Sequence, residues 1–238
     1  MATAPLPPLR LAVIPDGQRR WARANGKSFK EAYEAGAAII QEQIAVAAEE
    51  GAGAFAVWGG SVENLRERPA AELIVLHAVY ETFLKRVRDE WMHEPKNAAL
   101  RFVHMGRAEL LTNAERALIK EISDATKDRP GMVVALCLGY SGRDEEERAL
   151  EAWRAAGSRG DWKDHLDLPK QGIAATPFDL IIRTGETTDG PVHDNEFLHA
   201  YRRETRVRFR PELFPDMTPE MLRDDIRAFR ATDQRRGA

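Results

Sequence analysis

The sequence predicts an α/β fold: a single domain with a mostly parallel central sheet flanked by helices. Short apolar runs alternate along the chain with longer segments of helical periodicity. The 238 residues contain no internal repeat and no low-complexity linker that would divide them into separate domains. Strands that alternate with helices form parallel sheets covered on both faces, because each crossover lays a helix against the sheet.

Five apolar runs have the length of buried strands. They are Leu11–Ile14, Ala54–Trp58, Leu100–Met105, Met132–Leu138 and Phe178–Ile182. The fourth run contains Cys137, the only cysteine of the chain. A lone cysteine excludes an internal disulfide, and its apolar neighbours indicate a small buried hydrophobe rather than a nucleophile.

Four longer segments between these runs carry apolar residues at helical spacing. We expect helices over Phe29–Glu50, Pro69–Trp91, Ala108–Thr126 and Glu145–Gly157. Gly51 follows the first of them as a C-cap, because glycine tolerates the left-handed conformation in which many helices end. The domain is expected to span residues 10–238, after a Pro/Ala-rich lead-in over residues 1–9 that we expect to be disordered.

The composition is that of an ordinary globular protein, with 43% hydrophobic residues, 31% charged residues and a net charge of −3 at pH 7. This balance gives no indication of a nucleic-acid or anionic membrane partner. No apolar stretch approaches the roughly 20 residues that cross a bilayer. The N-terminus also lacks the basic and apolar regions of a signal peptide. We therefore expect a cytoplasmic protein without a transmembrane segment.

Ligands of parallel sheets bind outside the carboxyl ends of the strands, so the segments that follow the strands are the candidate sites. Asp16 and Gly17 follow the first strand, and Arg19 and Arg20 come next. Gly17 permits a tight turn, and arginines suit phosphate oxygens. An acidic residue beside an anion makes electrostatic sense when Mg²⁺ bridges the two. A helix N-cap with solvated arginines explains the same pattern, and spacing alone favours that structural explanation.

The second strand ends at Gly59 and Gly60, with Ser61 and Asn64 directly after them. Two glycines let the backbone approach a ligand closely, and the two polar side chains could orient a diphosphate or a proton in transit. The alternative is a glycine-rich turn in which Ser61 caps the next helix. Taken alone, this segment indicates little.

Together, the two segments resemble the N-terminal signatures of cis-prenyltransferases, the family of undecaprenyl diphosphate synthase. The first signature, I-M-D-G-N-x-R-W-A, is similar to Ile14–Ala22, and the second, F-S-x-E-N-W-x-R-P, is similar to Gly60–Pro69 with Arg68 one residue late. Four later segments also resemble the family, in the same order along the chain. Gly139–Asp144 is similar to the family's N-Y-G-G-R-x-E/D turn, and Ile182–Gly185 is similar to the start of its R-T-G-G-E loop. Phe209 with Phe214–Asp216 resembles its F…W-P-D-F segment, and Gln234–Gly237 resembles its R-x-R-R-F-G terminus. The resemblance covers nearly the whole chain and implies the cis-prenyltransferase fold.

The resemblance also implies a role for each matching residue. Asp16 would hold Mg²⁺ on an allylic diphosphate and help it leave, while Asn64 and Ser61 would take part in proton removal after carbon–carbon bond formation. The diphosphate would be bound by Gly17, Gln18, Arg19, Arg20, Trp21, Glu63, Arg68 and Arg183. Prenyl diphosphate substrates, Mg²⁺ as the cofactor and a homodimer are implied as well.

The chain departs from the family pattern mostly where phosphates bind. The family's arginine and histidine after the first signature fall at Phe29 and Tyr33, which carry no charge. After Arg183, residues 187–195 replace an R-x-S segment and lack arginine; we interpret them, with Glu196, as a polar surface loop rather than a metal site. The glutamate that supports the metal falls at Arg206, which we interpret as one of the solvated arginines between residues 202 and 210 rather than a replacement counter-charge.

These losses weaken the site for isopentenyl diphosphate more than the site for the allylic substrate. Pro15, the paired arginines and Tyr33 are similar to a divergent subgroup, the lavandulyl and cyclolavandulyl diphosphate synthases, which join two dimethylallyl units head-to-middle. We therefore expect a Mg²⁺-dependent isoprenyl transferase that acts on short allylic prenyl diphosphates and gives a short, irregular product. The bulky side chains that could form the floor of its pocket are His77, Tyr80 and Phe83.

Two alternatives stay open. In the first, the protein acts on a single diphosphate, as a terpene cyclase, a lyase or a transferase to a non-prenyl acceptor does. Such an enzyme does not need a second phosphate-binding loop, which agrees with the altered loop after Arg183. The other alternative is a non-catalytic or site-sharing subunit of a heteromeric prenyltransferase. Accessory subunits of the family typically lose the aspartate that is present here as Asp16, so we rank this alternative last.

Overall fold

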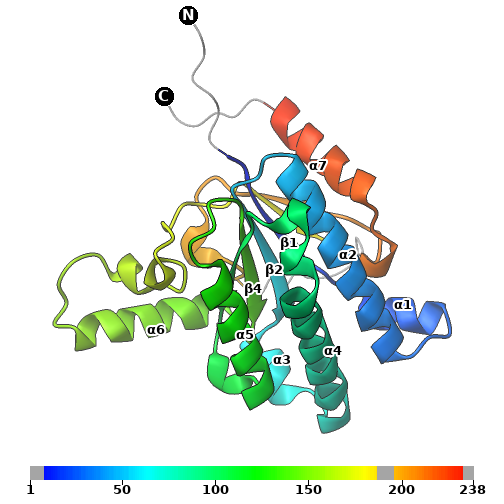
Figure 1. Cartoon of the computed structure of the whole chain (residues 1–238), viewed down its shortest axis with the longest axis horizontal. Coiled ribbons are helices and arrows are strands. Elements are labelled where there is room, and N and C mark those ends of the chain that lie inside the picture. Colours follow the sequence, from blue (N-terminus) through cyan, green and yellow to red (C-terminus); the bar gives the residue numbers. More distant parts are fainter. Residues whose placement is uncertain (1–7, 187–195, 233–238) are drawn as a thin grey trace, which may run out of the picture.

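The structure is a computed structural model that describes residues 8–186 and 196–232. In these ranges six strands form one parallel sheet in the order β3-β4-β2-β1-β5-β6. Figure 1 labels three of these strands, β1, β2 and β4. The strands are β1 Arg10–Ile14, β2 Ala54–Gly60, β3 Arg101–Met105, β4 Val133–Leu138, β5 Leu180–Arg183 and β6 Arg206–Phe209. The predicted fold class is confirmed, and the first five strands lie within two residues of the predicted runs.

Alternation along the strands divides the core into two layers, because successive side chains of a strand point to opposite faces. In β1, Leu11 and Val13 belong to one buried cluster, and Ala12 and Ile14 belong to the other. Cys137 is fully buried in the second cluster, as the sequence predicts. β1 lies at the centre of the sheet, where Val13 is in register with residues of both β2 and β5.

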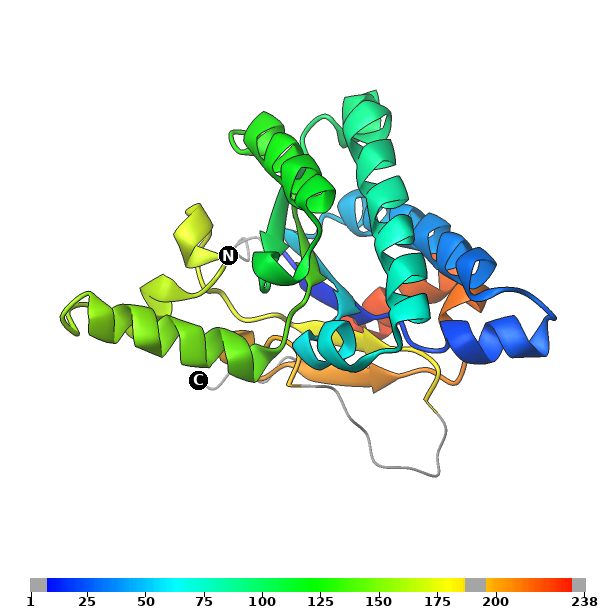
Figure 2. The ribbon, with the colours of Figure 1, turned by 90° about the horizontal axis from the view of Figure 1, so that it is seen from below.

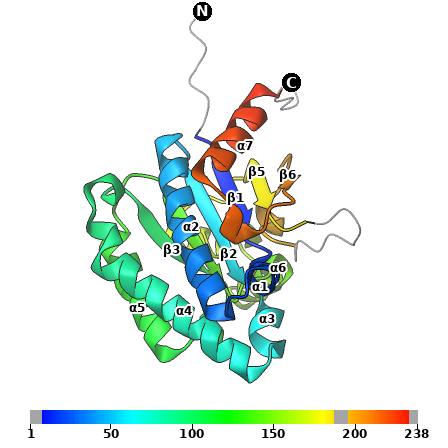
Figure 3. The same ribbon diagram turned by 90° about the vertical axis from the view of Figure 1, so that its right-hand side faces the viewer.

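Helices cover both faces of the sheet. Figure 3 shows α2, α4 and α5 on one side, and the first buried cluster joins these helices and α7 to the strands. Figure 2 shows α6 on the other side, away from α4 and α5. The helices are α1 Gln18–Ala24, α2 Phe29–Glu49, α3 Val62–Glu67, α4 Ala70–Asp89, α5 Asn113–Thr126, α6 Gly142–Ala155 and α7 Pro219–Ala231.

Local capping determines where two of these helices begin. Ser28 caps α2, and its hydroxyl oxygen accepts a hydrogen bond from the backbone N–H of Glu31, whose side chain bonds back to the N-cap. Thr112 and Glu115 make the same capping box at α5. The predicted start at Ala108 is therefore too early, and residues 108–110 form a separate 3₁₀ turn.

The strand β6 and the helix α7 were not predicted from the pattern. Their contact corrects the interpretation of residues 202–210 as solvated, because Arg210 is buried against the fully buried carboxylate of Asp225. The Arg210 Nε atom lies 2.6 Å from Oδ2 and its Nη2 atom lies 2.8 Å from Oδ1. Arg206 is exposed as predicted, and its guanidinium lies 5.7 Å from the ring centroid of Phe229.

Some expectations fall on residues that the structure does not describe. Residues 1–7 of the predicted lead-in and residues 187–195 of the altered loop lie outside the described ranges. Within those ranges, no helix has both the length and the apolar composition that a membrane span requires.

Candidate active site

The loops after β1 and β5 meet at Asp16. The hydroxyl of Thr184 accepts a hydrogen bond from the Asp16 N–H at 3.0 Å and donates one to the Asp16 carbonyl at 2.8 Å. The Asp16 carboxylate accepts from the Gly17 N–H at 2.6 Å and from Arg183 Nη2 at 2.9 Å. Because Thr184 is fully buried, this loop-to-loop contact holds the carboxylate at the carboxyl edge of the central strand.

Two glycines make this close approach possible. Gly17 has a φ of 108°, and a Cβ there would lie 2.8 Å from Leu213 Cδ2. Gly185 has a φ of 69°, and a Cβ there would lie 2.5 Å from Arg20 Nη2. That Arg20 nitrogen donates to the Gly185 carbonyl and lies 3.7 Å from Asp16 Oδ1. A side chain at Gly17 would collide with Leu213, and one at Gly185 would displace Arg20 from its place beside Asp16.

The second predicted segment folds as a capped helix. Ser61 is buried and accepts a hydrogen bond from the Asn64 N–H at 3.0 Å, as the capping alternative predicts. The Asn64 amide oxygen accepts from Arg68 Nη2 at 3.2 Å. Arg68 Nη1 also donates to the Tyr33 hydroxyl oxygen at 2.7 Å, which links α3 to α2.

These loops surround a cavity of about 590 Å³. Its inner wall is apolar and comes from α2, α4 and the strands β2 and β4, with the side chains Ile40, Val57, Leu76, Val79, Phe83, Leu84, Leu136 and Leu138. Its polar lining includes Asp16, Asn64 and the arginines 19, 20, 23, 68 and 183. The cavity therefore combines a hydrocarbon-sized apolar chamber with a cationic rim.

Two of the three side chains proposed for the pocket floor line this cavity. Phe83 and Tyr80 do so, and the Tyr80 hydroxyl donates to the Gly59 carbonyl at 2.6 Å. Burial raises the pKa of Tyr80 well above its usual value, so the phenol stays neutral. His77 does not line the cavity and instead makes a 2.9 Å contact with the buried carboxylate of Glu115 on α5.

The predicted diphosphate-binding residues divide into two groups. Gly17, Gln18, Arg19, Arg20, Arg68 and Arg183 line the cavity. Glu63 is exposed and Trp21 donates its indole N–H to Asp216 at 2.7 Å; neither is part of the lining. Ser61 lies outside the lining too, and its side chain accepts a hydrogen bond from the backbone N–H of the lining residue Asn64. The lining residues Tyr33 and Arg23 were not predicted as ligands, because Tyr33 carries no charge at the position of the family's histidine and no motif includes Arg23.

The Asp16 site fits a magnesium ion that protein and substrate hold together. Mg²⁺ takes oxygen ligands, commonly one or two carboxylates with substrate phosphates. Asp16 is the only carboxylate among the described lining residues, and 41% of its side chain is exposed. The described part of the chain has no cluster of three or more side chains able to ligate a metal. The donor set therefore suits an ion that also needs a diphosphate.

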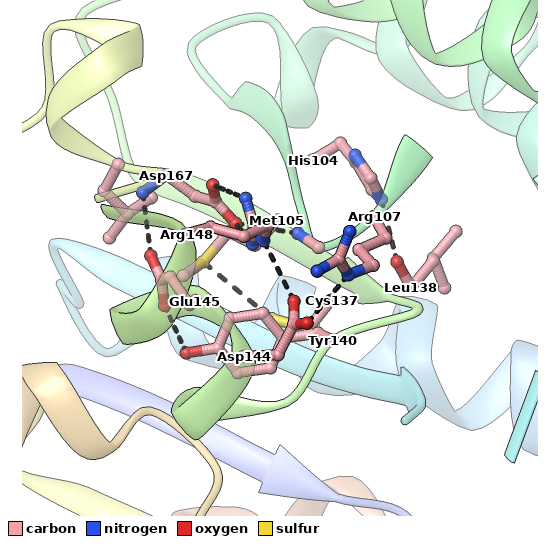
Figure 4. Close-up of polar contacts among 12 residues, drawn as sticks. His104, Met105, Arg107, Cys137, Leu138, Tyr140, Asp144, Glu145, Arg148 and Asp167 are labelled. Carbon is pink, nitrogen blue, oxygen red and sulfur yellow. Dashed lines mark hydrogen bonds and ion pairs between the residues drawn. The ribbon is translucent and has the colours of Figure 1, made fainter. Parts of the chain in front are cut away.

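A separate polar network lies behind the ends of β3 and β4 (Figure 4). Glu145, near the start of α6, accepts hydrogen bonds from the hydroxyls of Tyr140 and Tyr201 at 2.5 and 2.6 Å and from the Asp167 N–H at 2.7 Å. Burial, with a smaller contribution from the charge of Asp167, raises the pKa of Glu145 to about 7. Tyr140 accepts at its carbonyl from the indole of Trp58, which lines the cavity. Through this hydrogen bond the network helps to hold Trp58 in the wall of the cavity.

Known proteins resemble this chain over nearly its whole length. The prenyltransferase family model, described as undecaprenyl diphosphate synthase, matches residues 14–237. Isoprenyl transferase 2 of Corynebacterium efficiens is 29% identical over 243 residues, covering 97% of this chain and 93% of that protein. The isoprenyl transferase of Brucella abortus is 30% identical over 236 residues, covering 97% and 89%. The crystal structure of lavandulyl diphosphate synthase from Lavandula x intermedia, in complex with dimethylallyl diphosphate, has a TM-score of 0.84 at 25% identity and covers 95% of this chain and 96% of that one.

Proposed function

Because the chain belongs to the undecaprenyl diphosphate synthase family and is a prenyltransferase, we propose that it joins short allylic prenyl diphosphates in a Mg²⁺-dependent reaction. The product that we propose is a short prenyl diphosphate formed by head-to-middle coupling.

This proposal rests mainly on one observation: the same cavity has an apolar chamber and a rim of arginines. A volume of about 590 Å³ lies within the range of roughly 300–1,000 Å³ for drug-sized ligands. This size suits short prenyl chains better than long polyprenyl products. The rim supplies bidentate donors for phosphate oxygens at the point where the chamber opens.

In the proposed reaction, the side chains around Asp16 bind and stabilise the departing diphosphate. Arg20 and Arg183 lie beside the carboxylate and would also contact the leaving group as negative charge grows on it. Mg²⁺, when bound at Asp16, would supply further neutralisation of that charge. Gly17 and Gln18 line the same wall and complete the contact surface.

The predicted proton transfer by Asn64 and Ser61 stays a prediction. Asn64 lines the cavity, but its amide oxygen is bonded to Arg68, and the Ser61 oxygen caps α3. We propose that both residues act chiefly by holding Arg68 at the rim. Glu63 and Trp21 point to other surroundings and would contribute only through the backbone of their segments.

Head-to-middle coupling is supported by the likeness to lavandulyl diphosphate synthase, whose structure contains dimethylallyl diphosphate. It is also supported by the contacts of Arg206, which stands where the family has the glutamate that supports the metal. This guanidinium packs on Phe229 of α7 and donates a hydrogen bond to the Thr232 hydroxyl, and it supplies no carboxylate for a metal ion. A weakened site for isopentenyl diphosphate would favour coupling between two allylic molecules.

The test is incubation of the purified chain with Mg²⁺ and pairs of dimethylallyl, geranyl, farnesyl and isopentenyl diphosphates, with products identified by mass spectrometry. A branched product from dimethylallyl diphosphate alone would support the proposal, and loss of product with EDTA would support the metal requirement. Long linear products from isopentenyl diphosphate would contradict it. Pyrophosphate release from one allylic substrate without coupling would favour the single-diphosphate alternative.

The homodimer implied by the family is also a proposal. β6 is an edge strand of the sheet, with Phe209 43% exposed at its end. Exposed edges of this kind are sites where a second chain can pair. Light scattering of the purified protein tests the proposal, and a monomer at micromolar concentration would contradict it.

A further inference from the structure

Four elements bring polar side chains together on one side of the cavity rim, and all of these side chains except Glu72 line the cavity itself. Arg19 comes from α1, Tyr33 from α2, Asn64 and Arg68 from α3 and its C-cap, and Glu72 from the first turn of α4. This group, the rim cluster, is separate from the Asp16 group, which contacts Arg20 and Arg183. Four of the five arginines in the described lining therefore form two sets, each with its own carboxylate.

Arg68 is held from three sides. Its Nη1 atom donates to the Tyr33 hydroxyl at 2.7 Å, its Nη2 atom donates to the Asn64 amide oxygen at 3.2 Å, and Glu72 Oε2 lies 3.9 Å from Nη1. Only 19% of the Arg68 side chain is exposed. Long arginine side chains lose considerable rotamer freedom when they are ordered, so these partners prepare the guanidinium before any substrate arrives.

Glu72 is shared by two arginines. Its Oε2 atom lies 3.8 Å from Arg19 Nη1 and 3.9 Å from Arg68 Nη1. The same oxygen is buried and makes no hydrogen bond within the described residues, so its interactions there are with the two cations. Two guanidinium groups close together repel each other, and a carboxylate between them offsets that repulsion. The trio keeps a net charge of +1 (two arginines and one carboxylate), which still attracts a diphosphate.

Tyr33 is a neutral residue at the rim, and it acts on Arg68 rather than on a phosphate. The phenol cannot neutralise a diphosphate, but its oxygen accepts from Arg68 and its ring is anchored on α2. α2 forms one wall of the chamber through Gly36, Ala37 and Ile40. The helix that positions the Arg68 guanidinium through Tyr33 therefore also lines the chamber.

We propose that Tyr33 and Glu72 are positioning residues that fix Arg19 and Arg68 as a paired clamp for the diphosphate whose hydrocarbon enters the chamber. This inference rests on the proposed function, since it assigns which residues of that site hold one substrate. Neither residue needs to touch the substrate, because both act through the two arginines.

The first test is a double-mutant cycle between Tyr33 and Arg68. Tyr33→Phe keeps the ring and removes only the oxygen that accepts from Arg68. We expect it to weaken binding of Mg²⁺-pyrophosphate roughly five- to tenfold in calorimetry, as the loss of a hydrogen bond to a charged group does. The same substitution in an Arg68→Gln background is expected to have no further effect, because the coupled partner is gone. Equal losses in both backgrounds would overturn the inference.

The second test uses the sign of the effect of Glu72→Gln. If Glu72 merely opposes the bound anion, removing its charge makes pyrophosphate bind more tightly. If it positions the arginines, binding weakens although a repulsive charge has been removed. The inference expects severalfold weaker binding, with a matching rise in the KM for the allylic substrate. Tighter binding would overturn it. The matched control is Glu81→Gln on the same helix, which removes only a surface ion pair with Lys85 and is expected to leave binding unchanged.

The outcomes separate this inference from the proposed function. A parent protein that neither binds Mg²⁺-pyrophosphate nor couples allylic diphosphates would refute the proposed function. A parent that does both, with Tyr33→Phe and Glu72→Gln binding as tightly as it does, would refute the positioning role alone. Thermal unfolding of each variant, followed by circular dichroism, distinguishes a loss of positioning from a loss of fold.

Discussion

The buried carboxyl of Glu145 makes the stability of this protein depend on pH in a predictable direction. Glu145 lies in the network of Figure 4, where burial and then the charge of Asp167 raise its pKa from 4.5 to about 7. In the unfolded chain the group ionises near its ordinary value. Between the two values the native state keeps a proton that the unfolded state has lost, so the free energy of unfolding falls as the pH rises.

The magnitude follows from the two values. A rise from 4.5 to about 7 spans about 2.5 pH units, and each unit corresponds to about 1.4 kcal/mol. The contribution of Glu145 is therefore about 3–4 kcal/mol, fully present below pH 4.5 and lost as the pH rises through about 7. Glu145→Gln removes the titration while the side-chain shape is kept, and the two tyrosine hydroxyls can reorient to satisfy the amide.

The assay is urea unfolding of the parent and of Glu145→Gln at pH 5 and pH 8, followed by circular dichroism. We expect the parent to lose about 2–3 kcal/mol more than the variant between the two pH values, because part of the contribution is already lost at pH 5. Comparison with the variant removes the contribution of other titrating groups, because they are common to both proteins. An equal pH dependence of the two proteins, within about 0.5 kcal/mol, would refute the reasoning.

Four further perturbations follow from the site and the fold. Asp16→Asn should lower turnover roughly 10²-fold and abolish the Mg²⁺ dependence without changing the melting temperature; unchanged magnesium titrations would contradict the assigned role. Gly17→Ala should destabilise the protein by about 1–3 kcal/mol in urea, because the new Cβ would meet Leu213 at 2.8 Å and the φ of 108° is strained for alanine. Phe83→Ala should enlarge the chamber and shift products toward longer chains by mass spectrometry, whereas an unchanged product length would exclude it from length control. Phe209→Lys at the edge strand should convert the proposed homodimer to a monomer in light scattering, and a persistent dimer would point to another interface.

The main elements of the fold could be predicted from the order of apolar runs and helical segments. Runs such as Leu11–Ile14 are buried on both faces of the sheet, so almost every residue in them is apolar and the signal is strong. β6 carries the opposite pattern: as an edge strand it exposes Arg206, Arg208 and part of Phe209, so its sequence looks like a solvated segment. Burial at Arg210 depends on Asp225, which lies 15 residues further along the chain.

The motif residues of the candidate site could be predicted in a similar way. Asp16 comes after β1, and Arg183 is the last residue of β5, the neighbour of β1 in the sheet; parallel strands bring their carboxyl ends to one edge. For Ser61, the sequence left capping and proton transfer as alternatives, and the structure establishes the capping contact while the proton transfer stays a prediction. Glu63 is exposed because it lies on the outer face of α3, and the motif alone does not determine which face of the helix points outward.

By itself, the sequence determined that a carboxylate and several arginines follow the buried strands of a parallel sheet, because strand burial and turn chemistry are local properties. Only the tertiary structure decided which arginine meets which partner. The contact from Arg68 to Tyr33 crosses 35 residues and depends on how α2 and α3 pack. The same packing divides the arginines into an Asp16 set and a Glu72 set. The side chains of these sets come from several helices and strands, and residue spacing within one helix or strand does not determine the distances between them.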